Sequence, residues 1–419
     1  GRKNMSIKLI ASVAATTVAL ASACAFAQND DLSSRVSALE SQINSMTGGA
    51  VTINSALSYD LLNGASAVDQ SANVKNAKLS ANSITLGSYL AWGYQNAEYK
   101  NGPSSTHTDT ALNFGFDAAK VSTVGRIGND ISLVVLSSAD VNSNWTTATD
   151  FSKNTRTLSG KESFNVDQAY GLWNVNDQFY VFGGKKELAF GDYSSVNYMS
   201  GDIDSVRAAV DGVGIGSDTM IDGLTVVGTL YNSNDTVYLD APDKAGVSNW
   251  ALNTSYSGLA DGLRVGAGIM NAASQKNGAG AADVSSSTAA AGGKVGAMTV
   301  NFGYDLPGTD FSFSGNYFQL GKKLDGAKNK KSQWDLGGTY SNIADSGINA
   351  ALSYSTTDDG QATDSKASQW VLSSNYDLNA HANIGVELAR LSVDSGKVGD
   401  NHFKDQQFNA FTVDFTAWF

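Results

Sequence analysis

Side chains suited to acid–base or nucleophilic catalysis are scarce in this chain of 419 residues. Its three histidines are His107, His381 and His402. None of them falls on a predicted strand beside a serine, where a hydrolase built on strands would need its general base. Two glycine-rich stretches, 212–216 and 278–293, resemble phosphate-binding loops only superficially, because no helix follows to present its N-terminus to a phosphate. We therefore expect no enzymatic activity, no cofactor and no metal site.

The beginning of the chain has the features of an export signal. Lys8 supplies a positive charge, residues 9–23 form an apolar run, and Ala-Phe-Ala at 25–27 provides the small residues of a cleavage site. We expect cleavage after Ala27 and place residues 1–4 upstream of the true start. Residues 1–27 are therefore predicted to be a signal peptide that directs the protein out of the cytoplasm.

Removal of this signal would leave an acidic chain without cysteine. The 28 basic residues would fall to 25, against 40 acidic ones, because Arg2, Lys3 and Lys8 lie in the signal. The one cysteine, Cys24, lies there too, which excludes disulfides and thiolate metal ligands. The acidic balance argues against nucleic acid as a partner, since phosphate contacts need clustered lysine and arginine.

Residues 28–48 are predicted to form a short coiled-coil helix. Apolar residues recur there at spacings of four and three, and two glycines follow. A helix this short is marginal alone in water, so we expect it to form a bundle with copies of itself, either a dimer or a trimer. The alternative is a helix that lies on its own chain. The predicted coiled-coil core residues are Leu32, Val36, Leu39, Ile43 and Met46.

From residue 83 to residue 419 the chain alternates between about sixteen predicted strands and the gaps that join them. Short gaps alternate with long ones, which would place tight turns on one rim of a sheet and long loops on the other. The short gaps are 175–177, 259–262, 305–309, 343–346 and 379–381, and the long gaps are 95–109, 141–162, 188–204, 271–293 and 394–407. This arrangement is typical of membrane barrels. We predict an all-β fold, an antiparallel transmembrane β-barrel of about 16 strands.

The last predicted strand, 408–419, indicates how such a barrel would close. Apolar and polar residues alternate along it, so that one face is apolar and the other polar. A terminal strand inside lipid cannot keep an open edge, because each unpaired backbone group there costs several kcal/mol. We therefore expect it to pair with the first strand. The residues of its apolar face that we single out are Phe411, Val413, Phe415 and Phe419.

Three predicted strands repeat the order Trp, Leu, Tyr on one face. The Trp and Tyr lie six residues apart, or roughly 20 Å along a strand, so the two rings can flank an apolar band of about 25 Å in a tilted barrel strand. We interpret them as an aromatic girdle at the two membrane interfaces, with ordinary core packing as the alternative. The predicted girdle residues are Trp250, Tyr256, Trp334, Tyr340, Trp370 and Tyr376.

The opposite faces of these strands are polar, with residues such as Asn253, Gln333 and Asp414. A barrel of sixteen strands leaves an aqueous channel instead of filling its interior with side chains. This architecture, with its terminal phenylalanine, resembles the Gram-negative outer-membrane porins, in particular porin-like barrels preceded by a short coiled coil. The resemblance implies passive diffusion of small hydrophilic solutes or ions, contact with outer-membrane lipid and a homotrimer.

Residues 49–82, between the predicted helix and the barrel, are rich in Ser, Ala and Asn. The alternation over 51–59 fits a strand, whereas 61–78 reads as loop. We interpret the whole stretch as a periplasmic linker that could add one strand or enter the lumen.

The resemblance also implies a constriction, because the third long loop of sixteen-stranded porins typically folds into the lumen. That loop is 188–204 here, and its carboxylates would face basic residues of the wall. Fixed charges act strongly where a passage is narrow and screening is weak, so we predict a modest cation preference. A solvated loop is the alternative. The residues concerned are Asp192, Asp202 and Asp204 on the acidic side and Lys185, Lys186, Arg207 and Arg264 on the basic side.

A second class of function stays open at this point. The long gaps are rich in Ser, Thr, Asn and Ala, so they could serve a surface structural or adhesive barrel whose lumen is closed. They lack the exposed aromatic and arginine residues expected of strong binding hot spots. The sequence therefore favours the channel over the adhesive barrel.

Overall fold

The computed structural model describes residues 51–64, 67–77, 79–100, 108–140, 163–191, 209–232, 247–271, 296–323, 329–358, 366–398 and 401–419. The predicted signal peptide, its cleavage site after Ala27 and the predicted coiled coil of 28–48 lie outside these residues, so all three stay predictions.

The described residues form strands almost throughout, with three short helical elements near the beginning and one 3-10 turn. The helical elements are α3 (Ser55–Tyr59), the π-helix η1 (Asp60–Gly64), α4 (Ala67–Asn76) and the 3-10 turn η4 (Ile343–Asp345). The strands are β1 (Val51–Ile53), β2 (Ile84–Lys100), β3 (Thr108–Ile127), β4 (Ile131–Asp140), β5 (Ser163–Asn174), β6 (Phe179–Glu187), β7 (Ala209–Ile221), β8 (Leu224–Asn232), β9 (Val247–Ala260), β10 (Leu263–Met270), β11 (Ala297–Asp305), β12 (Phe311–Leu320), β13 (Ser332–Tyr340), β14 (Ile348–Asp358), β15 (Lys366–Asn379), β16 (Ala382–Val398) and β17 (Asn401–Trp418).

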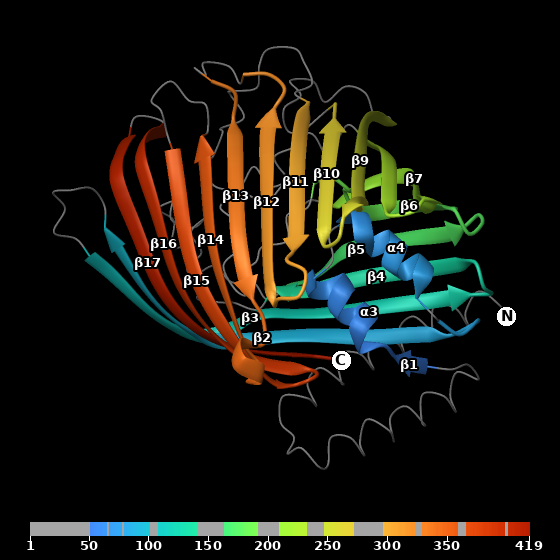
Figure 1. The fold of residues 1–419 in the computed structure, drawn as a ribbon, viewed down its shortest axis with the longest axis horizontal. Coiled ribbons are helices and arrows are strands. Elements are labelled where there is room, and N and C mark those ends of the chain that lie inside the picture. The colour runs from blue at the N-terminus through green and yellow to red at the C-terminus, as the bar shows by residue number, and fades with distance from the viewer. Residues whose placement is uncertain are drawn as a thin grey trace.

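Strands β2 to β17 close into a barrel of 16 antiparallel strands (Figure 1). Each strand pairs with its neighbours in the sequence, and β17 pairs with β2 in a register that runs from Trp418 opposite Tyr89 to Gln407 opposite Lys100. The predicted fold and the predicted closure by the last strand are confirmed. Every described barrel strand therefore has a partner on both sides, as an apolar surrounding would require.

The strand β1 occupies the one place where β17 is too short to cover β2. The ladder between β17 and β2 ends near Phe419, whose backbone exchanges two hydrogen bonds with Ser88. Residues 84–86 of β2 lie beyond that point and pair in parallel with Val51–Ile53. The start of the described chain is therefore attached to the end of the barrel that carries the short turns.

The alternation of gap lengths is as predicted except at one connection: the predicted long gap 394–407 is wrong, because β16 extends to Val398 and β17 begins at Asn401, where the two strands pair with each other. The connections after β3, β5, β7, β9, β11, β13 and β15 are short turns, and we call this end of the barrel the short-turn rim. Gly262 lies in the turn between β9 and β10 with φ +74°, and any side chain there would collide with the carbonyl of Asp305. Tight turns of this kind hold adjacent strands in register.

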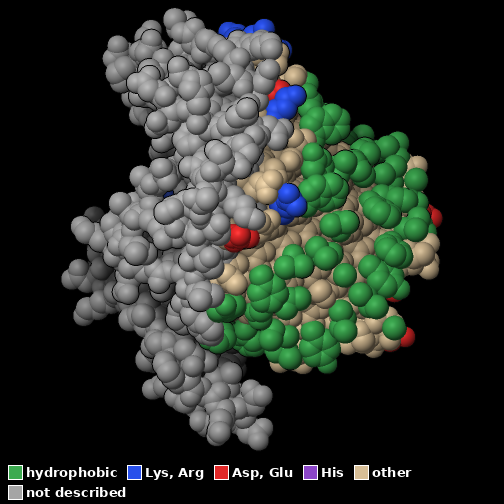
Figure 2. Space-filling model, turned by 90° about the vertical axis from the view of Figure 1, so that its left-hand side faces the viewer, with side chains coloured by type: hydrophobic (Ala, Val, Ile, Leu, Met, Phe, Trp, Pro, Cys, Tyr) green, Lys and Arg blue, Asp and Glu red, His purple; other side chains and the backbone are tan. Residues whose placement is uncertain are grey.

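The two faces of the sheet differ in composition. Large apolar side chains on the outer face are exposed, including Leu133, Ile215, Leu336 and Leu388. On the side of the barrel drawn in Figure 2, hydrophobic side chains gather over the outer wall. The alternate residues of the same strands point inward and are buried. Because successive side chains of a strand point to opposite faces, one barrel strand presents an apolar exterior and a separate interior surface.

The predicted linker, residues 49–82, has a different structure from the one that the sequence predicts. Residues 61–78 were expected to be loop, but α4 and most of η1 fall there, and the strand predicted over 51–59 ends at Ile53. The side chain of Asn54 caps α3 by accepting a hydrogen bond from the Leu57 backbone at 3.0 Å. Leu57, Leu61 and Val74 are buried against the barrel. Tertiary packing, which local composition does not report, therefore decides the helical conformation.

None of the helices in the described part of the chain is long and apolar enough to cross a membrane.

Candidate functional site

The inner wall of the barrel is the surface on which the polar side chains converge. Over β9 to β17 it is built of hydroxyl, amide and carboxylate groups that alternate with the exposed apolar residues of the outer face. The buried polar residues of this wall include Asn249, Asn253, Ser255, Thr299, Asn301, Asn316, Gln333, Asp335, Ser353, Gln369, Ser373, Asn375, Glu387, Thr412, Asp414 and Thr416. We call this surface the polar wall.

Three carboxylates lie on the polar wall. Asp335 on β13 accepts a hydrogen bond from the Gln333 amide at 2.7 Å, and Asp414 on β17 accepts one from the Thr416 hydroxyl at 3.1 Å. Glu387 on β16 is only 1% exposed. The backbone leaves room for Asp414, because a Cβ atom at the neighbouring Gly385 would come within 2.5 Å of its carboxylate oxygen.

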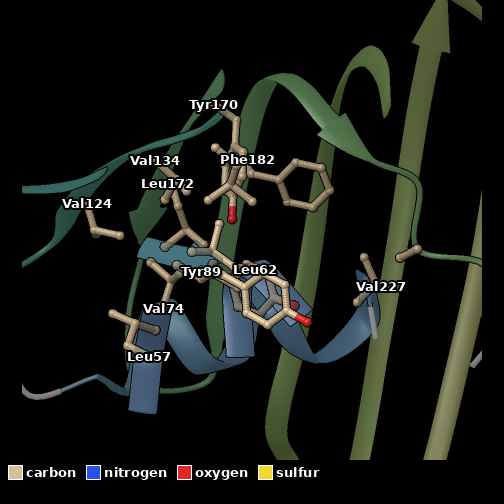
Figure 3. Packing of buried hydrophobic residues seen from close by; sticks show 14 of the residues in the cluster. Leu57, Leu62, Val74, Tyr89, Val124, Val134, Tyr170, Leu172, Phe182 and Val227 are labelled. Atoms are coloured by element: carbon tan, nitrogen blue, oxygen red, sulfur yellow. The ribbon is translucent and has the colours of Figure 1, made fainter. Parts of the chain in front are cut away.

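The inner wall over β2 to β8 is mixed instead, with buried polar residues such as Ser122, Ser132 and Thr229 beside large apolar ones. Its buried apolar residues form one cluster with Leu57, Leu61, Leu62 and Val74 of the segment 51–77. In Figure 3, Leu57, Leu62 and Val74 of that segment lie against side chains of the strands. The wall's contribution to the cluster is Tyr89, Ala91, Val124, Val134, Leu136, Tyr170, Leu172, Tyr180, Phe182 and Val227. We call this surface the apolar wall.

Polar contacts fix the helical segment at its α4 end. The Lys75 ammonium lies 2.5 Å from the Asp218 carboxylate of β7 and donates to the Asp177 carbonyl at 2.6 Å. Both side chains of the ion pair are buried. Asn76 donates to the other oxygen of Asp218 at 2.7 Å. These contacts join α4 to two neighbouring turns of the short-turn rim.

Further contacts follow the segment along the apolar wall. The Lys120 ammonium donates to the Leu62 carbonyl at 3.0 Å, and Gln168 donates to the Gln70 amide oxygen at 3.3 Å. Gln70 in turn donates to Glu187 at 3.4 Å, near the end of β6. The segment is therefore attached to the wall at both of its ends and in the middle.

The first residues of the loop after β6 turn inward. Leu188 and Phe190 are buried in a second apolar cluster, and the Phe190 ring meets the Phe318 ring of β12 edge-on at 6.4 Å. The backbone N–H of Gly191 donates to the Asn253 side chain of β9 at 3.0 Å. This segment thus crosses from β6 to the inner faces of β9 and β12.

The residues predicted to form the constriction are only partly placed. Asp192, Asp202, Asp204 and Arg207 lie outside the described residues, so their role stays a prediction.

The three basic residues that the structure places do not lie together. Lys185 and Lys186 are on opposite faces of β6. Lys185 is on the outer face and donates to the Val166 carbonyl at 2.6 Å. Lys186 is buried on the inner face, over the rings of Tyr170 and Phe182. Arg264 is on the inner-facing side of β10, next to the short-turn rim.

The aromatic residues singled out in the sequence lie on the outer face. Trp250, Trp334 and Trp370 are exposed there, and Tyr317 and Tyr354 of neighbouring strands lie beside Trp334 and Trp370 with ring centroids 4.9 and 4.5 Å apart. The tyrosines of the same set, Tyr256, Tyr340 and Tyr376, lie on the same strands toward the short-turn rim. Of the C-terminal residues, Phe411 is exposed, and Val413, Phe415 and Phe419 are half-buried.

Sequence reasoning missed Lys75 and Asp218, which form the buried ion pair. Both are ordinary charged residues, and Lys75 falls in the stretch 61–78 that the sequence analysis interprets as loop. A signal was present in the apolar wall itself, because Val134, Leu172 and Phe182 are large apolar residues on the face that would otherwise be polar. An inner face of this kind predicts that something packs on it.

Within the described ranges, no group of three or more His, Cys, Asp or Glu side chains is placed to hold a metal ion. Two shallow grooves of about 380 and 360 Å³ lie on the barrel surface, and both are lined by Leu352 and Trp370. These grooves belong to the apolar exterior and lie away from the polar wall.

No protein-family model matches the chain, and no curated protein sequence matches it either. Among solved structures, it is similar to an anion-selective porin from Comamonas acidovorans, with 13% identity and a TM-score of 0.52 over 80% of this chain and 100% of that one. It is also similar to the outer-membrane channel DcaP of Acinetobacter baumannii, with 12% identity and a TM-score of 0.53 over 80% and 97%. Salmonella typhi OmpF aligns with 14% identity and a TM-score of 0.52 over 81% and 98%. The chain therefore has the fold of the outer-membrane porins, a closed barrel of 16 antiparallel strands.

Proposed function

We propose that the protein is an outer-membrane channel through which small hydrophilic solutes diffuse passively. The observation that carries the proposal is the polar wall, an inner surface rich in amides, hydroxyls and carboxylates on eight strands of a closed barrel. Polar groups on this face would be unfavourable in a barrel whose interior is filled by an apolar core. Water and dissolved solutes are the partners that suit them.

We further propose a modest preference for cations. Asp335, Glu387 and Asp414 place negative charges on the polar wall, where Arg264 and Lys331 offset part of them, and Lys186 lies on the apolar wall between aromatic rings. Asp192, Asp202 and Asp204 of the third long loop would add to this field. The anion selectivity printed for the Comamonas porin belongs to that protein, since the likeness between the two chains is one of fold.

The proposed assembly is a homotrimer in lipid, exported by a signal peptide that is cleaved after Ala27. The exposed apolar exterior supports contact with lipid acyl chains or with another barrel. The predicted coiled coil of 28–48 would add to contacts between barrels. Crosslinking of the purified protein would distinguish the trimer from a monomer.

Conductance in a planar bilayer under a KCl gradient tests the channel. We expect discrete steps and a reversal potential that favours K⁺. Substituting Asp192, Asp202 and Asp204 with Asn should reduce that preference, and an unchanged preference would show that the third long loop does not carry it. A heat-modifiable, folded barrel without any conductance would contradict the channel itself.

A surface structural or adhesive barrel with a closed lumen is the second candidate. The observation that favours it is the covering of the apolar wall by residues 51–77, which removes part of the interior from any aqueous path. This candidate predicts a folded barrel without conductance and binding through the long loops. The bilayer experiment therefore decides between the two.

A further inference from the structure

We propose that residues 51–77 are an internal plug, which closes the β2–β8 side of the lumen and confines permeation to the polar wall. The inference rests on the proposed channel function and names the part of the chain that limits it. The plug is held in place by the ion pair between Lys75 and Asp218. Its position, its contacts and the composition of the wall beneath it all support this role.

The apolar wall is built to receive the segment. Val134, Leu172 and Tyr180 are at most 1% exposed, although they lie on the inner face of a barrel whose other half is polar there. Val74 of α4 is completely buried in the same cluster. Without residues 51–77 these side chains would face water, at a cost of about 25 cal/mol per Å² of apolar surface. The segment and this wall are therefore complementary.

The ion pair makes the attachment specific. Lys75 satisfies the Asp218 carboxylate at 2.5 Å and the Asp177 carbonyl at 2.6 Å. The exposed fractions of the two charged side chains are 6% and 9%. A buried charge without its partner is strongly unfavourable, so loss of either partner would favour release of α4. We call this pair the latch.

The N-terminal end of the segment is anchored separately. The hydroxyls of Thr52 and Thr85 lie 3.0 Å apart where β1 pairs with β2. The rings of Tyr59 and Trp418 lie 4.9 Å apart beside the closing strand of the barrel. Breaking the latch should therefore free α4 while β1 and α3 stay attached, so that the plug moves without leaving the barrel.

A plug of this size must change conductance. An α-helix with its side chains is about 10–12 Å across, which is a large share of the interior of a sixteen-stranded barrel. The path left for solutes would then lie on the side of the barrel that carries Asp335, Glu387 and Asp414. Solutes would meet carboxylates and amides on one side and the plug on the other.

Single-channel conductance of latch variants tests the inference. Asp218→Asn and Lys75→Gln should each raise the conductance by about 1.5-fold or more, or add a larger level of that size, because α4 leaves the path. The matched control is Asp222→Asn, which removes the same charge from the turn after β7 outside the latch. Exchange of the two charges, Lys75→Asp with Asp218→Lys, should return the conductance toward the native value.

Thiol labelling gives a second readout. Val74→Cys, with Cys24→Ser, places a single thiol at a fully buried position of α4. A water-soluble maleimide should label it slowly in the native latch and at least about tenfold faster with Asp218→Asn, and labelling of the opened plug should alter the current. Should Asp218→Asn fail to assemble, Asn76→Ala removes a different hydrogen bond from the same carboxylate.

The outcomes separate the two proposals. Absence of current from every folded variant would contradict the proposed channel. Native conductance in both latch variants, with the thiol at position 74 still protected or with its labelling leaving the current unchanged, would overturn the plug and leave residues 51–77 as a structural support.

Discussion

The two halves of the inner wall differ in the side chains that they turn inward. On β9 to β17 the inward residues are polar, as Asn301, Gln333 and Thr412 illustrate. On β2 to β8 they include a cluster of large apolar side chains, as Val134 and Leu172 illustrate, and residues 51–77 pack on this cluster. Both halves keep an apolar exterior. A barrel strand can therefore carry large apolar side chains on its inner face as well as its outer face where something packs against the inner face.

The two walls therefore require different surroundings. A polar inner face is stable only beside water or beside polar partners, whereas an apolar inner face is stable only beside other apolar groups. The boundary between the two walls therefore marks where an aqueous path ends and a packed core begins. Substitutions that exchange the two chemistries should have unequal effects.

The largest effect is expected from Lys75→Ala, which would separate the plug from the apolar wall. Removal of one partner of a buried ion pair typically costs about 3–5 kcal/mol, because the other charge stays buried. Backbone amides of α4 should therefore exchange hydrogen more than about 100-fold faster, since each 1.4 kcal/mol is a factor of ten. Hydrogen exchange read by mass spectrometry checks this result, with the amides of β12 and β13 as an internal reference.

A double-mutant cycle sharpens this prediction. Lys75→Ala combined with Asp218→Ala removes both charges, so it should cost less than the sum of the two single substitutions. Additive effects would mean that the pair is not coupled. In that case the apolar contacts alone would hold α4 against the wall.

A reciprocal exchange of wall residues should give the next largest effect. Leu172→Asn places an amide in the apolar wall at a side chain that is 1% exposed, and we expect a loss of about 2–5 kcal/mol of stability. Asn301→Leu puts an apolar group of similar size into the polar wall. Its amide oxygen has no hydrogen-bond partner among the described residues, so we expect a cost below about 1 kcal/mol.

Urea unfolding in lipid vesicles, followed by tryptophan fluorescence, measures both free energies. Conductance gives a second readout for the same exchange. Asn301→Leu should lower the single-channel current clearly, although its effect on the free energy of unfolding is small. Equal destabilisation by the two substitutions would mean that both walls are equally well packed. That result would contradict the distinction between a packed apolar wall and a polar wall.

Much of the fold could be predicted from alternation alone. The strand around Trp334 alternates apolar and polar residues so regularly that its two faces are evident, and tight turns such as the one at Gly262 mark the rim. Period-2 patterns report the two surroundings of a strand directly. Closure of the barrel could also be predicted, because the final strand needs a partner on each edge inside lipid.

The plug could not be predicted in the same way. Residues 61–78 contain few large apolar side chains, and α4 is too short to be a stable helix alone. Its conformation depends on the apolar wall, most of which lies more than 40 residues further along the chain. The ion pair of Lys75 with Asp218 joins residues 143 positions apart, and no local pattern indicates such a pair.

A smaller effect is expected where the plug meets the closing strand. Tyr59→Leu removes the ring contact with Trp418 at 4.9 Å but keeps an apolar side chain. Aromatic pairs contribute about 0.5–1.5 kcal/mol beyond the area that they bury, so protection of the α3 amides should fall by roughly tenfold or less. Tyr59→Phe keeps the ring and is the matched control. A fall of the same size in both variants would assign the effect to the lost hydroxyl instead of the ring.

The smallest effect in energy is expected from the carboxylates of the polar wall. Glu387→Gln and Asp414→Asn keep the shapes of their side chains and remove one negative charge each from the side opposite the plug. A shift of the reversal potential by about 10 mV toward anions corresponds to only about 0.2 kcal/mol per ion, yet a KCl gradient resolves it. The plug makes this test sensitive, because confinement of ions to the polar wall keeps them close to these charges, where screening by salt is weakest. Release of the plug by Asp218→Asn should therefore reduce the shift that Glu387→Gln produces, and a shift of the same size in both backgrounds would mean that ions do not follow the polar wall.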